Sequence, residues 1–357
     1  METVSNESAS TLLSLADTVD VPQGKVVVVY RSKDITNAIS PYLLEAVYTD
    51  HIGGESDSVE LELEDADRRW QNAWYPSFGD TLTVSIGYEG QPLLPCGVFE
   101  IDEIELKGPP DTVRVKALGA GVKRPVRTRA GRAYEDVTLA DIAATIARRN
   151  KLTLRGKIET IRITRATQTW ESDLTFLNRI SAEYGYEFSV RGALLTFCKR
   201  STLKAATSVL VVGRADLISY QFHDKVHSIF LASTVTYHDP HAKRTRRKRV
   251  SDPSSKLSAY DHYSADELNL NVRAEDDTQA HLKAQAALER ANDDQTGATL
   301  THYGNTKIAA GINILVQDFG RMNGKYSVTQ SRHRFSRASG YSTETELKRV
   351  REAANGG

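Results

Sequence analysis

An alternation of apolar and polar residues with a period of two recurs along residues 24–119 of this sequence. In VELELE (59–64), Val59, Leu61 and Leu63 fall on one face, and TLTVSIGY (81–88) repeats the pattern. Side chains alternate between the two faces of a β-strand, so these segments are predicted to be half-buried strands. The predicted strands of this region are 25–30, 43–52, 59–64, 81–88, 96–108 and 111–119. The short turns between them predict a sandwich or a small barrel.

Beyond a basic linker at residues 122–132, the pattern becomes helical in VTLADIAATIARRN (137–150). Thr138 is a good N-cap, and Asp141 stands three residues later, as in a capping box. Apolar residues at 139, 142, 143 and 146 share one face of the predicted helix. The segments KLTLRG (151–156) and TIRITRAT (160–167), which follow, look extended.

The stretch WESDLTFLNRISAEYGYEFSV (170–190) contains acids, aromatics and an arginine that resemble a reaction site. Rules for helix ends and strands explain these residues without a reaction site. Ser172 can cap a helix, Asp173 in the first turn suits the helix dipole, and Gly185 stands where a left-handed residue ends a helix. Alternation at 186–190 then predicts a strand. We interpret the stretch as a helix that is followed directly by a strand.

The remaining pattern divides the chain into four sections between two ends. Further strands are predicted at 194–199, 208–213, 218–226, 228–239, 297–304, 312–320 and 325–336, and a helix at 278–293. The predicted divisions are a flexible arm (1–23), a β section (24–122), an α/β insertion (123–205), a second β section (206–250 with 298–347), a helical insertion (251–297) and a tail (348–357).

Composition indicates an ordinary globular protein. The 357 residues carry a formal net charge of zero, so the chain as a whole has no electrostatic preference for nucleic acid or anionic membrane. Cys96 and Cys198 are the only cysteines, and so small a number argues against a disulfide framework and favours a reducing compartment. No segment approaches the roughly 18 apolar residues of a membrane helix, and residues 1–20 do not resemble a secretory signal. Folding in a cytoplasm is expected.

Histidines at 223, 227, 238 and 241 are a candidate zinc set. Two of them, His223 and His227, lie on a predicted strand, where residues four apart do not converge as they do on a helix. Surface histidines near a strand end are the preferred interpretation, so we expect no metal and no cofactor.

Glu103 and Glu105 share one face of a predicted strand, and Asp102 points the other way. Glycoside hydrolases use a pair of carboxylates as catalytic groups. Acidic residues on the solvated face of a strand are far commoner than such a catalytic pair. The nucleophile elbow, the Walker A loop and the HExxH motif are all missing from the sequence, and GAGV (119–122) is too short for a dinucleotide loop. We therefore expect no catalytic residues.

KRTRRKR (243–249) has six basic residues in seven: Lys243, Arg244, Arg246, Arg247, Lys248 and Arg249. Such a run is a candidate nucleic-acid patch or nuclear signal, although no aromatic residues interleave it for base stacking. The preferred interpretation is a solvated loop between two β elements. An intermediate one is a basic loop that faces an acidic partner or lines a path taken by nucleic acid.

The stretch at 170–190 also resembles a helix of the late control protein D family of contractile phage tails, a family related to the hub part of the VgrG spike of type VI secretion. The matching residues are Glu171, Ser172, Asp173, Leu174, Phe176, Leu177, Arg179, Ile180 and Gly185. Segments 99–121, 134–152 and 309–347 resemble further family segments in the same order, so the resemblance spans residues 24–347.

This resemblance implies a non-enzymatic hub of a contractile phage or phage-derived tail, located in the virion baseplate and assembled in the host bacterial cytoplasm. It implies an α+β, mostly β fold, with two similar antiparallel β-barrel domains and inserted α/β and helical segments. It also implies a homotrimer that adapts the six-fold tail tube to a three-fold central spike. The implied partners are the tail tube protein, the spike protein, the tape-measure protein, other baseplate proteins and DNA in transit through the lumen.

Three alternatives stay open at this level. They are a VgrG-like hub component of a secretion apparatus, a tail-associated cell-wall hydrolase, and a DNA-binding protein that uses Lys243 to Arg249. The matched motifs are packing motifs, so the resemblance transfers no site residue.

Overall fold

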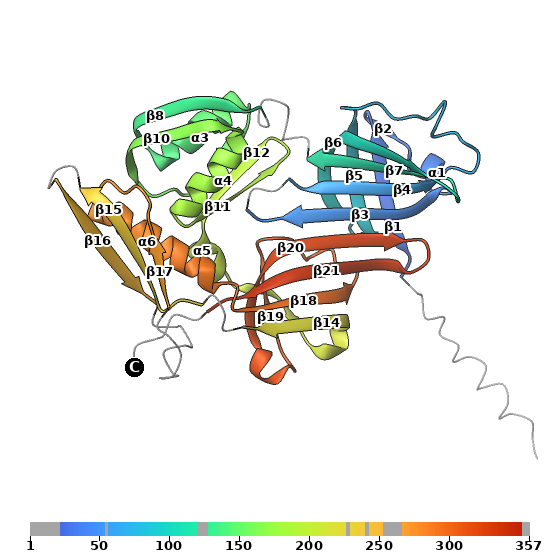
Figure 1. Ribbon diagram of the computed structural model, residues 1–357. Coiled ribbons are helices and arrows are strands. Elements are labelled where there is room, and N and C mark those ends of the chain that lie inside the picture. Colours follow the sequence, from blue (N-terminus) through green and yellow to red (C-terminus); the bar gives the residue numbers. More distant parts are fainter. Residues whose placement is uncertain are drawn as a thin grey trace, which may run out of the picture.

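The computed structural model describes residues 22–53, 56–119, 128–225, 229–239, 243–252 and 266–351. Within these residues, one 13-stranded sheet curls around two separate apolar cores, and three smaller sheets with helices lie together to one side of it (Figure 1). The prediction of a mostly β chain with two antiparallel barrel-like halves and inserted α/β segments is confirmed.

The first barrel contains every strand predicted between residues 24 and 119. Its elements are β1 (Gly24–Tyr30), β2 (Lys33–Asp34), α1 (Thr36–Ile39), β3 (Leu43–His51), β4 (Ser58–Glu64), β5 (Thr81–Tyr88), β6 (Leu94–Lys107) and β7 (Thr112–Gly119). The strands run in the order β3-β4-β7-β6-β5-β1, and every neighbouring pair is antiparallel. Val59, Leu61 and Leu63 are buried, so the period-2 pattern correctly predicts which face of β4 points into the barrel.

The second barrel is assembled from segments far apart in the sequence. It comprises β13 (Ser208–Val212), β14 (Leu217–Asp224), β18 (Thr296–Tyr303), β19 (Asn313–Val316), β20 (Gly324–Ser336) and β21 (Gly340–Arg349), with short 3-10 turns η1 (Arg214–Asp216) and η3 (Gly320–Met322). The strand order is β14-β18-β21-β20-β19-β13, and β13 runs parallel to β19. Its core includes Leu300, Ile314, Val316, Tyr326 and Val328.

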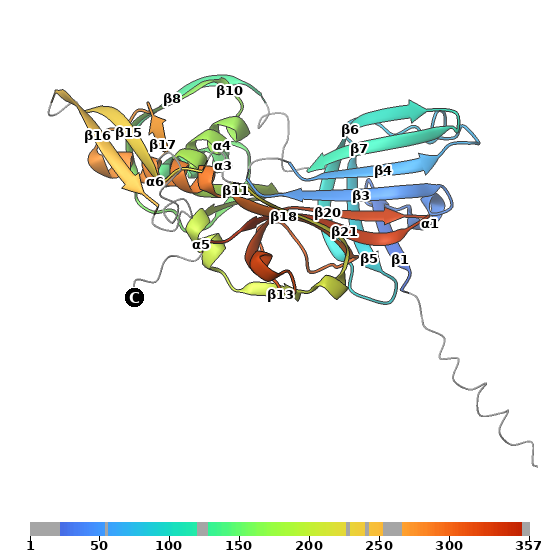
Figure 2. The same ribbon diagram turned by 60° about the horizontal axis from the view of Figure 1, so that its bottom comes forward.

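The two barrels share one continuous sheet, because β20 leaves the second barrel and pairs with β3 of the first (Figure 2). Residues Gln330–Ser336 of β20 lie opposite Glu45–His51 of β3. Phe335 and Tyr341, from β20 and β21, pack into the core of the first barrel. The first barrel therefore depends on C-terminal residues to complete its interior.

The first insertion lobe covers residues 128–205. It contains β8 (Ala130–Thr138), α3 (Leu139–Arg149), β9 (Thr153–Arg155), β10 (Arg162–Glu171), α4 (Asp173–Glu183), β11 (Tyr186–Arg191), β12 (Leu194–Lys199) and α5 (Arg200–Ala205). Both predicted helix starts are confirmed, with a capping box between Thr138 and Asp141 and an N-cap at Ser172. Gly185 has φ +75°, as a left-handed helix end requires.

The second insertion lobe differs from the predicted division of the chain. Strands β15 (Ala232–Asp239) and β16 (Arg244–Ser251) leave the barrel and form a separate sheet with β17 (Glu267–Leu270), against which α6 (Asp277–Asn292) packs. The predicted barrel boundary at residue 250 is therefore wrong, and so is a purely helical insertion at 251–297. Barrel pairing ends near Asp224 because the next strands pair with each other.

The predicted ends also need adjustment where the structure describes them. Lys348 and Arg349 belong to β21, and Arg351 forms an ion pair with Asp252 at 2.7 Å, so this part of the predicted tail is anchored. Of the predicted arm only Pro22 and Gln23 are described. Of the predicted basic linker only residues 128–132 are described, and 130–132 already belong to β8.

Candidate functional site

The basic run 243–249 forms most of strand β16, which corrects the prediction of a solvated loop. Lys243 is a turn residue with φ +49°, and Arg244–Ser251 then pairs antiparallel with β15 over eight residues and no register shift. Lys248 Nζ lies 2.6 Å from Asp277 Oδ2 on α6, and Arg249 Nε lies 2.8 Å from Glu267 Oε1 on β17. Part of the run is therefore used to hold the lobe together.

The candidate histidines do not form one group in the structure. His223 lies on β14 of the large sheet and His238 on β15 of the small one, whereas His227 and His241 lie outside the described residues. Over the described ranges, no three His, Cys, Asp or Glu side chains are placed to hold a metal ion.

The candidate carboxylates lie on β6 with their side chains exposed. Glu103 is opposite Lys116 and Glu105 is opposite Arg114 on β7, and a register shift separates Ile101 from Glu103. Opposite charges across neighbouring strands stabilise a sheet, so a structural role accounts for both glutamates. Of the two cysteines, Cys96 is buried and Cys198 half-buried, and each is a free thiol.

Asp173 has a larger role than sequence reasoning assigned to it. Its carboxylate is 1% exposed and accepts hydrogen bonds from Arg149 Nη1 (2.9 Å), Asn150 Nδ2 (2.8 Å), Gln168 Nε2 (3.0 Å) and Arg132 Nη1 (3.3 Å). These donors come from α3 and its end, β10 and β8. The motif that resembles a reaction site is thus the charged centre that joins four elements of the first insertion lobe.

A second charged cluster, with two buried aspartates and an exposed arginine, joins both barrels to this lobe. Arg191, at the end of β11, donates to Asp50 Oδ1 and lies 3.4 Å from Asp57 Oδ2. Ala310 N, in the second barrel before β19, donates to Asp50 Oδ2 at 2.8 Å. Burial raises the pKa of Asp57 to about 7, and the nearby Asp50 carboxylate contributes to the same shift. Burial also raises the pKa of Asp50. No sequence signal identifies this cluster, because Arg191 and Asp50 are 141 positions apart.

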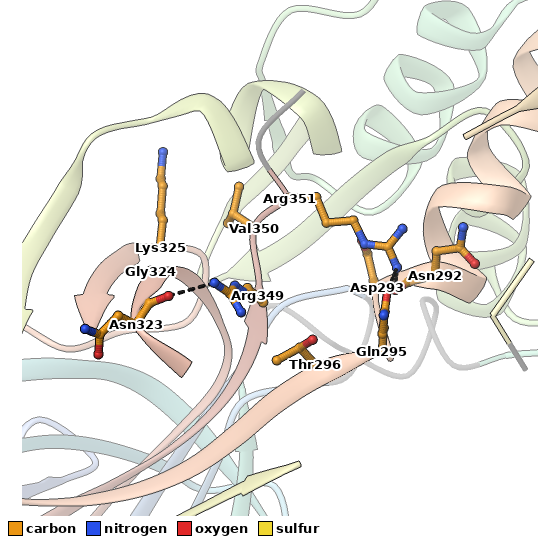
Figure 3. A pocket seen from close by; sticks show the side chains of 10 residues that line it. All are labelled: Asn292, Asp293, Gln295, Thr296, Asn323, Gly324, Lys325, Arg349, Val350 and Arg351. Atoms are coloured by element: carbon orange, nitrogen blue, oxygen red, sulfur yellow. Dashed lines mark hydrogen bonds between the residues drawn. The ribbon is translucent and has the colours of Figure 1, made fainter. Parts of the chain in front are cut away.

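A polar pocket of about 340 Å³ lies where the second insertion lobe rejoins the second barrel (Figure 3). Arg351 donates to Asp252 Oδ2 (2.7 Å) and Gln295 Oε1 (2.9 Å), and Arg349 donates to the Asn323 carbonyl (2.7 Å). Asn292 binds both the N–H and the carbonyl of Phe230, each at 2.8 Å. The hydrogen bonds of Asn292, Arg349 and Arg351 therefore fix the two places where the chain passes between this lobe and the second barrel.

Exposed apolar side chains occur on β13 and β14, the two strands of the second barrel that η1 connects. Val209 and Val211 of β13 and Ile218 and Tyr220 of β14, here called the β13–β14 patch, are each between 43 and 58% exposed. Among the described strands, β13 pairs only with β19 and β14 only with β18, so both present an unpaired edge. Apolar side chains beside open strand edges are typical of surfaces that another chain covers.

The part of the chain that the structure describes contains no helix long and apolar enough to cross a membrane. Its buried charged groups contact other parts of the same chain, and its exposed features include a basic strand and apolar side chains on the second barrel. These are the features of a protein that assembles with others.

Comparison with known proteins places this architecture among phage tail proteins. The fold is shared with the 43 kDa tail protein of prophage MuSo2 from Shewanella oneidensis, with a TM-score of 0.70 and 14% identity over 92% of this chain and 98% of that one. Residues 59–339 match the family described as phage tail baseplate hub (GPD), and the chain belongs to this family. The resemblance seen in the sequence is confirmed.

Two curated relatives carry the same description. The probable baseplate hub protein of Escherichia phage 186 is 29% identical over 271 residues, which cover 73% of this chain and 69% of that protein. The probable baseplate hub protein of Escherichia phage P2 is 36% identical over 185 residues, which cover 51% of this chain and 46% of that protein. The aligned part thus spans about half the length of the P2 protein.

Proposed function

We propose that this chain is a structural baseplate hub of a contractile phage or phage-derived tail. Three copies form a ring that adapts the six-fold tail tube to the three-fold central spike, without enzymatic activity. The proposed partners are the tube, spike, tape-measure and other baseplate proteins, and DNA crosses the lumen only in transit. The family membership and the names of the relatives support this role.

One structural observation carries the proposal: a single chain contains two mostly antiparallel barrels, which are joined through β3 and β20 into one sheet. Three such chains supply six barrels. A ring of this kind has approximate six-fold symmetry toward the tube and true three-fold symmetry toward the spike. The continuous sheet fixes the spacing of the two barrels within each chain, which a symmetry adaptor requires.

The β13–β14 patch is the proposed contact between neighbouring copies. Ring closure uses a head-to-tail contact, in which one surface of a chain meets a different surface of the next chain. The patch has the apolar side chains and the open strand edges that such a contact covers.

Native mass spectrometry tests the proposal, on the chain alone and after co-expression with the protein encoded next to it. The expected species contains three chains, each of 39.5 kDa, and has a mass of about 118 kDa. In the co-expressed sample the mass of three spike subunits is added to this value when they bind. Charged side chains in an apolar contact remain desolvated without partners, so Val211→Asp with Ile218→Asp is expected to reduce the trimer to a monomer.

Leu106→Asp is the matched control, because Leu106 is 47% exposed near the end of β6, in the other barrel. This variant is expected to remain trimeric. A monomer in both unmodified samples would remove the hub proposal. A trimer that survives the double change would place the contact elsewhere on the chain.

Three other roles give different results in the same preparation. Cell-wall hydrolysis that disappears when one acid, such as Glu103, is replaced would favour a hydrolase. DNA binding at low salt by a monomer, lost when charges in 243–249 are removed, would favour a DNA-binding protein. Isolation with secretion-sheath components in place of tail fibres would favour a VgrG-like role.

A further inference from the structure

The edge of strand β16 is open and strongly basic. In the sheet order β16-β15-β17, β15 is central and pairs with β16 over eight residues. Among the described strands nothing pairs with the other edge of β16. About half of the residues in an antiparallel edge strand direct their N–H and C=O groups away from the sheet. These groups are available to a further strand.

The two faces of β16 are both basic. Val250 packs against the core beneath α6, and Lys248 pairs with Asp277 of α6, so Arg244, Arg246 and Lys248 lie on the α6 face. Thr245, Arg247 and Arg249 lie on the opposite face and are exposed. Lys243, Arg244 and Arg247 form no ion pair with any residue that the structure describes. Asp239 of β15 is the acidic residue opposite Arg244, and net positive charge remains at the start of the strand.

This charge decides which strand can add to the edge. A second copy of β16 would bring like charges opposite one another, which destabilises a sheet. Basic side chains therefore protect the edge against pairing with itself. An acidic strand would gain opposite-charge pairs on both faces in addition to main-chain hydrogen bonds.

We propose that β16 is a docking strand for an acidic, extended polypeptide segment of another protein, which adds to the sheet along the free edge of β16. Main-chain hydrogen bonds supply affinity in strand addition, and the alternating side chains supply selectivity. Charge complementarity and the open edge both point to this occupant. The inference does not depend on the trimer proposed above.

A nucleic acid is the weaker occupant. It cannot use the outward N–H and C=O groups of a strand edge. Tyr237, the aromatic residue on β15 opposite Arg246, is buried in the core beneath α6 and offers no face for base stacking. Two of the six basic side chains are already paired with Glu267 and Asp277, which reduces the charge that phosphates would meet.

The test uses the full chain and a labelled nonapeptide in which glutamate alternates with valine and threonine. Fluorescence anisotropy measures its affinity. A second peptide of the same charge, with two valines replaced by proline, cannot complete the ladder of main-chain hydrogen bonds. A third peptide has lysine in place of glutamate, and a single-stranded DNA oligonucleotide is the polyanion probe.

The glutamate peptide is expected to bind, and the proline peptide to bind about tenfold more weakly or not at all. The lysine peptide is expected not to bind. Hydrogen exchange is expected to slow within 244–251 when the glutamate peptide is added. The double change Arg244→Glu with Arg247→Glu is expected to weaken binding about tenfold.

Arg148→Glu with Arg155→Glu is the matched control, because both arginines are exposed in the first insertion lobe and the change in charge is the same. This variant is expected to bind like the unmodified chain. Equal binding of the proline peptide, tighter binding of DNA than of the glutamate peptide, or no binding of the glutamate peptide would overturn the proposal. A trimer that fails to bind would overturn this inference alone, and a monomer that binds would overturn the hub proposal alone.

Discussion

Asp173 is the residue whose removal should damage the first insertion lobe most specifically. Replacement by alanine leaves Arg132 and Arg149 facing each other without their shared carboxylate. Breaking a fully buried ion pair costs about 3–5 kcal/mol. The arginines keep some solvent contact, so for Asp173→Ala we expect a loss of about 2–3 kcal/mol in free energy of unfolding.

Urea unfolding followed by the fluorescence of Trp170, which lies on β10 of the same lobe, measures this loss when Trp70 and Trp74 are replaced by phenylalanine. Asp141→Ala is the control, because it removes an exposed capping carboxylate at a cost of about 1 kcal/mol. A loss for Asp173→Ala no larger than this control would contradict the central role of the Asp173 carboxylate.

Asp57 should make stability depend on pH in the direction opposite to an ordinary paired carboxylate. Its pKa is raised by burial and by Asp50 to about 7, so the folded chain binds a proton that the unfolded chain has released. The stabilisation from this group is full below about pH 4, near the unfolded pKa, and is lost as pH rises toward 7. Asp57→Asn stays neutral throughout.

We therefore expect the melting temperature of Asp57→Asn to fall less than that of the unmodified chain between pH 5 and about 8, and to exceed it at the upper end. Scanning fluorimetry across this range measures the effect. Asp67→Asn, at an exposed position, should follow the unmodified curve. Parallel curves for Asp57→Asn and the unmodified chain would show that Asp57 is ionised in the folded state.

At the scale of elements, the sequence predicts best where local chemistry decides the structure. The alternation in β4 and β5 and the caps at Thr138, Ser172 and Gly185 each depend on residues a few positions apart. The sequence does not predict strand β16, because six basic residues in seven carry no apolar alternation. Its conformation comes from pairing with β15 and contact with α6, which a local pattern does not contain.

At the scale of the molecule, the contacts that unite the barrels are the ones that the sequence could not show. Arg334 of β20 pairs with Glu45 of β3 across 289 positions, and Asp50 reaches Ala310 across 260. No periodicity or spacing rule encodes such partners. The family resemblance implies two barrels, but the shared sheet and the Asp50, Asp57 and Arg191 cluster are formed only by long-range contacts in the folded chain.

The shared sheet predicts that the two barrels unfold together. Leu300 is fully buried in the second barrel, and Leu300→Ala should cost about 2–5 kcal/mol. Trp70 and Trp74 belong to the first barrel, so in a Trp170→Phe background their fluorescence reports that barrel alone. Because β20 pairs with β3 and Tyr341 completes the first core, the loss in the second barrel should appear in this signal.

The measurement is urea unfolding at one fixed protein concentration, since oligomerisation also shifts apparent stability. Leu61→Ala, inside the first barrel, sets the full effect on the same signal. We expect Leu300→Ala to lower the midpoint by a similar amount. A midpoint that moves for Leu61→Ala and stays fixed for Leu300→Ala would mean that the barrels unfold separately. In that case the β3–β20 pairing would hold two independent units side by side, and a hub built from them would need its partners to set their spacing.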